Sequence, residues 1–152
     1  MTLVKQKRFT SESKPGGYIW KIRRDRALKS RLEVNHDAQP LFDEAVRLYK
    51  CREWTAARKI LILLPEIDPQ SPAIYSTLGL VCWEIGLLNE AAEAFRRAIR
   101  LKPAFEAASL GLFQCLWRLD KRDEALEEAK RFLSIADSAE YDEIIREINE
   151  KL

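Results

Sequence analysis

The chain has little of the chemistry that enzyme active sites and metal centres require. Its 152 residues include a single histidine, His36, and no cysteine or carboxylate cluster surrounds it in the sequence. This excludes the usual zinc ligand sets and argues against a histidine-based catalytic triad. The five glycines form no phosphate-binding loop, since only Gly16 and Gly17 are adjacent and they predict a flexible turn. We therefore expect no enzyme activity, no metal and no cofactor.

Cysteines and long apolar runs are scarce as well. The spacing of the three cysteines, Cys51, Cys82 and Cys115, matches no zinc or redox motif. An odd number without close pairs favours a reducing compartment, so we expect a cytoplasmic location and buried packing roles for all three. No apolar run approaches the ~20 residues of a membrane span, and no signal-peptide segment follows the start.

The sequence does contain a period of 34 residues. The period relates Tyr49, Trp83 and Trp117; Leu48, Cys82 and Leu116; Ala57, Ala91 and Ala125; and Leu61, Phe95 and Ala129. A fixed interval of this length indicates a stacked repeat array. Each unit is too small to bury its own apolar face, so neighbouring units share one continuous core. Such a scaffold offers surfaces in place of catalytic pockets, which favours a binding module.

The clearest copy of the repeat covers residues 72–105 and reads as two helices. Its first helix carries a buried stripe at i, i+3, i+4 and i+7, which begins at Tyr75. Gly79 lies in this stripe, and its missing side chain would let a neighbouring helix approach closely. Ser71 and Pro72 are suited to begin the helix, and Gly86 is suited to end it.

This copy resembles the tetratricopeptide repeat. The residues that match the family pattern are Tyr75, Leu78, Gly79, Cys82, Gly86, Ala91, Phe95, Ala98 and Pro103. The resemblance implies an all-α fold, an α-solenoid of about three tetratricopeptide-repeat (TPR) helix pairs followed by a C-terminal capping helix. The expected organisation is a basic N-terminal extension over 1–34 and a repeat domain over 35–152, with repeats at about 38–71, 72–105 and 106–139 and a cap over 138–152.

The outer copies are more diverged. The first has Arg52 where the turn glycine is expected, and Pro65 should end its second helix early. The third has Phe113 at the small-residue position and Asp120 at the turn. In the last helix, Asp137 and Glu140 fit a capping box, and one apolar and one acidic face suit a solvating cap.

The charges are distributed unevenly along the chain. Residues 1–31 hold ten basic and two acidic residues, a net +8, whereas the remaining residues carry −6. This basic arm is interpreted as a solvated extension or as one that docks on the acidic repeats of the same chain. Contact with nucleic acid or an anionic membrane, or with the protein partner, are the alternatives, and an organelle transit peptide is a weaker one.

The resemblance also implies a concave surface, lined by the first helix of each pair. The residues predicted to bind a partner there are Phe42, Val46, Tyr49, Lys50, Leu80, Trp83, Gln114, Trp117 and Arg118. Tyr49, Trp83 and Trp117 lie one position beyond the core stripe, and large apolar residues repeated on an exposed face usually mark a binding site. Alternatively, Tyr18, Ile19 and Trp20 of the N-terminal segment fill this groove, or the aromatic residues pad the array interior.

One family subtype is disfavoured by the same positions. Repeats that bind the acidic tails of heat-shock chaperones use a clamp of Lys, Asn and Arg. Here the corresponding positions hold Phe42, Val46, Leu80, Leu110 and Gln114, so the groove is better suited to an extended apolar peptide or an amphipathic helix.

A weaker resemblance links the chain to type III secretion translocator chaperones. These proteins have a similar size, an N-terminal extension and segments like residues 113–116 and 63–68 of this chain. The hypothesis is therefore an adaptor or chaperone-like protein that binds a peptide or helix of another protein. A nucleic-acid-associated protein that uses residues 1–31 and a toxin-neutralising immunity protein are the alternatives, and pairing of two copies into a homodimer is open.

Overall fold

The computed structural model describes residues 37–151, so the predictions about the basic arm lie outside the described residues. Within them the chain forms seven α-helices and one short 3-10 helix, with no strand. The all-α prediction, with helix pairs and a final capping helix, is confirmed. The chain divides into two compact units at Pro69 and Gln70, and each unit is described by itself. None of the described helices is long and apolar enough to cross a membrane.

The described part of the first unit is one helix pair. It comprises α4 (Gln39–Lys50), α5 (Trp54–Leu61) and the 3-10 helix η1 (Leu64–Glu66). One stripe of α4 is buried and consists of Leu41, Ala45 and Leu48, a spacing that places them on one face. The second helix stops at Leu61, and Pro65 lies in η1. The expected early end of this helix is confirmed, because proline cannot continue the backbone hydrogen-bond ladder.

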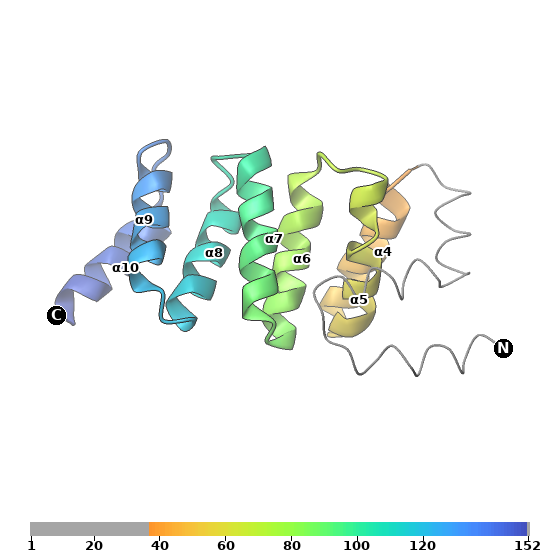
Figure 1. Ribbon diagram of the computed structural model, residues 1–152, viewed down its shortest axis with the longest axis horizontal. Coiled ribbons are helices and arrows are strands. Elements are labelled where there is room, and N and C mark those ends of the chain that lie inside the picture. The colour runs from red at the N-terminus through yellow and green to blue at the C-terminus, as the bar shows by residue number, and fades with distance from the viewer. Residues whose placement is uncertain (1–36, 152) are drawn as a thin grey trace. The chain divides into compact units, whose positions relative to one another are not determined.

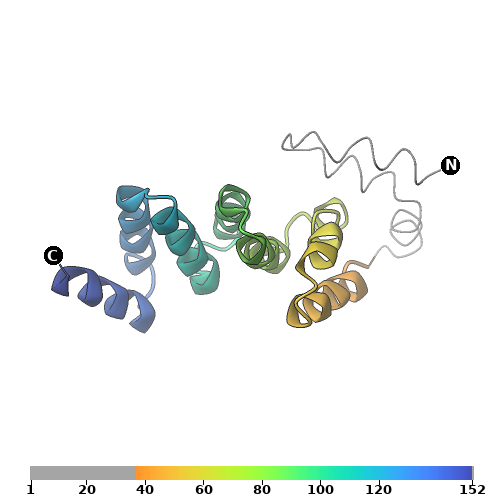
Figure 2. The ribbon, with the colours of Figure 1, turned by 90° about the horizontal axis from the view of Figure 1, so that it is seen from below.

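The second unit is a run of five helices. These are α6 (Pro72–Ile85), α7 (Leu88–Leu101), α8 (Glu106–Arg118), α9 (Arg122–Leu133) and α10 (Ala139–Glu150). From α6 to α9 each helix packs on the next, and α6 also packs on α8, as Figures 1 and 2 show. The contact between α6 and α8 matters most for function, because it places the first helices of two successive pairs side by side.

The centre of this unit is the ring of Phe95, which has a glycine on either side. A Cβ atom at Gly79 of α6 would lie 2.7 Å from Phe95 Cε1, and one at Gly111 of α8 would lie 2.5 Å from Phe95 Cζ. No side chain fits at such distances, so both helices can approach the ring only because these residues are glycine. The close approach expected at Gly79 is confirmed, whereas the sequence gave no reason to single out Gly111.

The turn within each helix pair has the same backbone form. Arg52, Gly86 and Asp120 have φ angles of 62°, 90° and 59°, in the left-handed region that glycine favours. Residues Glu53, Leu87 and Lys121 each donate a backbone N–H to the carbonyl five residues earlier, at 2.8–2.9 Å. The turn is thus repeated even where the glycine of the family pattern is missing.

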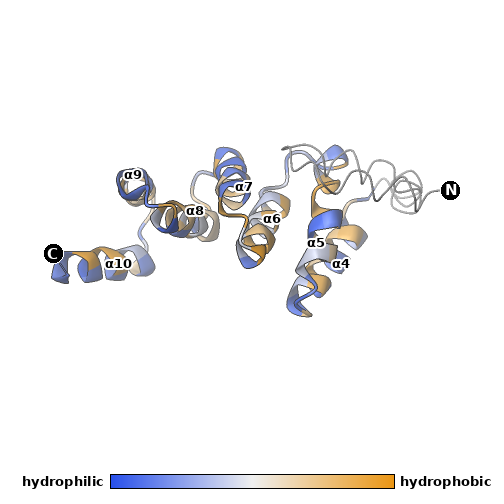
Figure 3. Ribbon diagram, turned by 60° about the horizontal axis from the view of Figure 1, so that its bottom comes forward, coloured by the Kyte–Doolittle hydropathy of each residue, from blue (hydrophilic) through white to orange (hydrophobic). Residues whose placement is uncertain are grey.

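The last helix begins differently from the prediction. The Ser138 hydroxyl accepts the Tyr141 N–H at 3.1 Å, so the cap is Ser138 and the proposed capping box of Asp137 and Glu140 is wrong. The reason is local: Ser138 has the extended backbone that an N-cap requires, with φ −149° and ψ 116°. Apolar and polar residues alternate around α10 (Figure 3), and Ile144 and Ile148 pack against the core.

The cysteines are only partly as expected. Cys82 and Cys115 are buried in the second unit, which confirms their packing role. Cys51 is exposed, and the prediction of burial is wrong for this residue. The physical reason is its position directly after α4, at the turn, where the helical stripe no longer faces the core.

Candidate functional site

Four of the nine predicted binding residues lie on α4. Phe42, Val46 and Tyr49 are half-buried and Lys50 is exposed. Their spacing of four, three and one residues places them along one side of the helix. All four belong to the first unit, and they are therefore considered apart from the other five.

The other five residues form what we call the α6–α8 face. It consists of Leu80 and Trp83 on α6 and of Gln114, Trp117 and Arg118 on α8. Leu80 is 39% exposed, an unusual value for a large apolar side chain, and Gln114 and Arg118 are also exposed. Because α6 packs directly on α8, residues more than 30 positions apart in the sequence share this face.

Trp83 and Arg118 make direct contact across the two helices. The Arg118 guanidinium carbon lies 4.8 Å from the centre of the Trp83 ring, which is a cation–π arrangement. The face of the Trp83 ring is thus covered by a cation. The surface here is less apolar than the sequence suggested, and its exposed apolar part is Leu80.

Trp117 is also covered. Its ring stacks on Phe113 with centres 5.6 Å apart and planes at 17°, and the Arg122 guanidinium lies 5.3 Å from its centre. Both tryptophans are half-buried and pack against the core. Each ring therefore fills the interior with one part and leaves another part exposed, so padding and binding are compatible roles.

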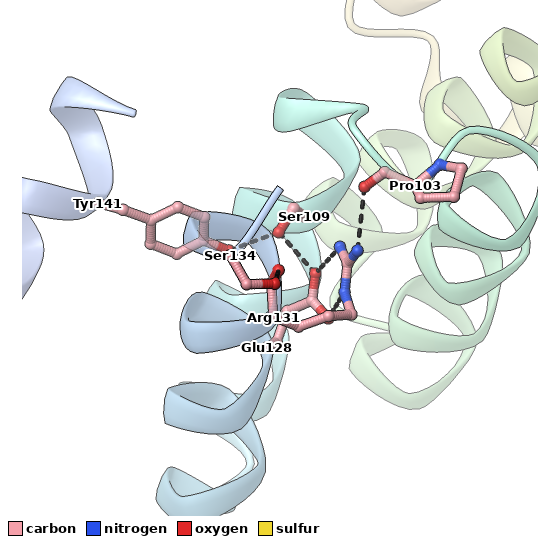
Figure 4. A network of polar contacts seen from close by, with 6 residues as sticks. All are labelled: Pro103, Ser109, Glu128, Arg131, Ser134 and Tyr141. Atoms are coloured by element: carbon pink, nitrogen blue, oxygen red, sulfur yellow. Dashed lines mark hydrogen bonds and ion pairs between the residues drawn. The ribbon is translucent and has the colours of Figure 1, made fainter. Parts of the chain in front are cut away.

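A second group of functional side chains was missed by sequence reasoning. We call it the α10 anchor, and it consists of Ser109 on α8, Glu128 and Arg131 on α9, and Tyr141 on α10. The Ser109 hydroxyl donates to Glu128 Oε1 at 2.6 Å and lies 2.7 Å from the Tyr141 hydroxyl. Because the single Ser109 proton goes to Glu128, Tyr141 donates to Ser109. Figure 4 shows the Tyr141 ring reaching from α10 to this serine.

Arg131 completes the α10 anchor. Its Nε and Nη2 atoms donate to the two oxygens of Glu128 at 2.8 and 2.6 Å, and Nη1 donates to the Pro103 carbonyl at 3.0 Å. This is the bidentate arrangement in which a guanidinium binds a carboxylate most strongly. The buried carboxylate of Glu128 is therefore fully paired, and the network joins three helices and the α7–α8 connection.

Burial changes the pKa of two groups in this unit. Burial, reinforced by the charge of Glu128, raises the pKa of Tyr141 to about 12. Burial also raises the pKa of the Cys115 thiol to about 11. Both groups are neutral at physiological pH, which fits side chains that pack and donate hydrogen bonds. Neither has the lowered pKa that a nucleophile needs.

A signal for the α10 anchor does exist in the repeat. Ser109 and Glu128 stand 34 positions after Tyr75 and Ala94. A serine in place of a core aromatic residue, together with a glutamate in place of a core alanine, would leave polar atoms buried. Tyr141 supplies an aromatic ring and a hydroxyl from α10, so the two substitutions and the cap compensate for one another.

Family comparison agrees with this geometry. A tetratricopeptide-repeat family model matches residues 86–148, which span α7 to most of α10. The chain is a tetratricopeptide-repeat protein. No curated protein matches it in sequence.

Several solved structures share the tetratricopeptide-repeat fold with this chain. The first TPR of Spaghetti (RPAP3), bound to the HSP90 peptide SRMEEVD, has a TM-score of 0.68 at 17% identity and covers 75% of this chain and 91% of its own. The Yersinia enterocolitica type III secretion chaperone SycD, in complex with a peptide of the translocator YopD, has a TM-score of 0.64 at 17% identity and covers 74% and 86%. MamA has a TM-score of 0.66 at 14% identity and covers 90% and 96%. At these identities the likeness concerns the fold.

Proposed function

We propose that this tetratricopeptide-repeat protein is a protein-interaction module, adaptor or chaperone-like, that binds a peptide or an amphipathic helix of another protein on the α6–α8 face. The observation that carries the proposal is Leu80, which lies exposed on α6 one turn before Trp83. A large apolar side chain beside aromatic rings favours contact with an apolar residue of a partner. Phe42, Val46, Tyr49 and Lys50 of α4 are proposed to contribute in the same way.

Two of the structural neighbours support this proposal through their contents. The RPAP3 repeat domain and SycD each carry a bound peptide of another protein. In the described residues of this chain, no group of three His, Cys, Asp or Glu side chains could hold a metal ion. The prediction that the protein is not an enzyme stands on the same reasoning as before. The nucleic-acid alternative depends on residues 1–31, which lie outside the described residues, and it stays a prediction.

The α6–α8 face can be tested by affinity capture from nuclease-treated native lysate. The bait is the full chain as wild type, as Leu80→Asp and as Ile135→Asp. Ile135 is the matched control, because it is also an exposed branched apolar residue, 50% exposed, but it lies between α9 and α10. Since both side chains are exposed, both variants should fold, and circular dichroism melting checks this.

The expected result is a protein that is captured by wild type and by Ile135→Asp and is lost from Leu80→Asp. Mass spectrometry then identifies it. An identical set of captured proteins from all three baits would show that the α6–α8 face does not bind, and the proposal would be withdrawn.

A further inference from the structure

Arg118 differs from most arginines of the second unit in its electrostatic partners. Arg96, Arg100, Arg122, Arg131 and Arg146 each lie within 4.0 Å of a carboxylate oxygen. Arg118 pairs with no carboxylate in residues 37–151, although the second unit has 15 acidic and 11 basic residues. Its recorded contact is the Trp83 ring. A cation without a carboxylate in an acidic unit is available to a ligand.

Stacking holds the guanidinium without using its hydrogen-bond donors. Arginine has five N–H donors in the plane of the group, and contact with an aromatic ring uses only the flat face. The ring also restricts the side chain, which lowers the entropy that binding would otherwise cost. Arg118 is therefore prepared for two parallel hydrogen bonds to a planar carboxylate.

The neighbours of Arg118 define what must accompany that carboxylate. Leu80 lies one turn before Trp83 on α6 and offers an exposed apolar contact. Gln114 lies one turn before Arg118 on α8, is exposed, and has an amide that can donate as well. An apolar contact and a carboxylate-binding group thus lie on either side of the same tryptophan.

We infer that the partner of the α6–α8 face is a peptide segment that places a carboxylate on Arg118 and an adjacent apolar side chain on Leu80. The inference rests on the proposed function and specifies its ligand. The net negative charge of the surrounding unit repels further carboxylates. The preferred segment is therefore not uniformly acidic but carries one acidic residue next to an apolar one.

The test is a selection from a random twelve-residue peptide library displayed on phage, with the full chain as target. Four targets are compared: wild type, Arg118→Glu, Leu80→Asp and Arg97→Glu. Arg97 is the matched control, because it is an exposed arginine over an aromatic ring, 5.7 Å from the centre of Tyr75, but it lies on α7. Selected peptides are then synthesised, and their affinities are measured by fluorescence anisotropy.

We expect wild type and Arg97→Glu to select peptides with an acidic residue beside an apolar one. Arg118→Glu should bind these peptides about tenfold or more weakly and should select basic residues instead, because reversing one charge of a close pair turns attraction into repulsion.

Two other outcomes would overturn the inference, and they are distinguishable. Peptides that require Leu80 but show no acidic preference, or that bind Arg118→Glu equally well, would remove the inference and leave the proposed function intact. A selection that yields no peptide dependent on Leu80 would remove both.

Discussion

The α6–α8 face and the α10 anchor lie at the two ends of one helix, α8, and use similar residues in opposite ways. In the α10 anchor, Tyr141 and Glu128 are buried, and their polar atoms are hydrogen-bonded to Ser109 or Arg131. On the α6–α8 face, Arg118 lies over an aromatic ring and pairs with no carboxylate among the described residues.

Solvation explains the difference between the two regions. A polar group removed from water must find a protein partner, since an unpaired buried donor or acceptor costs about 1–3 kcal/mol. An exposed guanidinium keeps its water and can remain without a carboxylate at little cost. A paired interior network therefore stabilises the fold, whereas an unpaired cation beside exposed apolar surface is free to bind. The contrast can be tested by substitutions in each region.

The largest effect is expected from removing the central ring of the α10 anchor. Tyr141→Ala should lower the free energy of unfolding by about 3–5 kcal/mol, because a fully buried aromatic side chain leaves a cavity. Urea denaturation followed by circular dichroism measures the change. Ile145→Ala, at a half-buried position of the same helix, should cost about 1 kcal/mol or less. Equal effects would mean that Tyr141 is not the main attachment of α10.

Alkaline pH should weaken the same region. The pKa of Tyr141 is raised from 10.0 to about 12, so the folded state favours the neutral phenol. This contribution is complete below pH 10 and is lost as the pH rises to about 12, up to about 3 kcal/mol in total. Denaturation curves between pH 8 and 12 measure it.

Tyr141→Phe is the control for this titration. Cys115, whose pKa is raised from 9.0 to about 11, contributes loss of the same sign in both proteins. The variant should therefore lose less stability than wild type over this interval. Parallel curves would show that the Tyr141 phenol is not responsible.

A smaller effect is expected where the two regions are joined. Gly111→Ala should destabilise the protein by about 1–3 kcal/mol, because its Cβ would lie 2.5 Å from Phe95 and would force α8 away from the ring. Thermal melting measures the change, with Gln114→Ala on the exposed side of α8 as the control. A stabilised Gly111→Ala variant would contradict the close packing of α8 on Phe95.

The smallest effect on stability is expected on the α6–α8 face itself. Arg118→Gln should change the free energy of unfolding by no more than about 1 kcal/mol, the range of an exposed cation–π contact. The same substitution in the α10 anchor, Arg131→Gln, should cost more, because it removes two hydrogen bonds from the buried Glu128 carboxylate. Urea denaturation of both variants compares them directly, and a larger loss at Arg118 would reverse the assignment of the two regions.

Much of the fold could be predicted from local pattern. The interval of 34 residues and the buried stripes that start at Tyr75 and Ala91 describe helices whose apolar faces point to one core. Gly86 and Pro65 were correctly expected to end helices, because both act on the backbone of their own turn. The failures were also local: Ser138 and not Asp137 has the backbone of an N-cap, and Cys51 falls in a turn.

The candidate site was less predictable. Leu80, Trp83, Gln114, Trp117 and Arg118 were all named from their repeat positions, but nothing in the sequence indicated that Arg118 would cover Trp83. Likewise, Ser109, Glu128 and Tyr141 carry a recognisable departure from the repeat, but the compensation is visible only when the three side chains meet.

The sequence by itself determined the all-α class, the succession of helix pairs and the positions of the turns. Each of these depends on backbone preferences and on apolar periodicity, which act over a few residues and repeat with the chain. Only the tertiary structure decided which side chains meet. Ser109 reaches Tyr141 across 32 positions, and Arg118 reaches Trp83 because α8 packs on α6. Periodicity states which face of a helix is buried, whereas the identity of the facing residue depends on how two glycines let the helices close on Phe95.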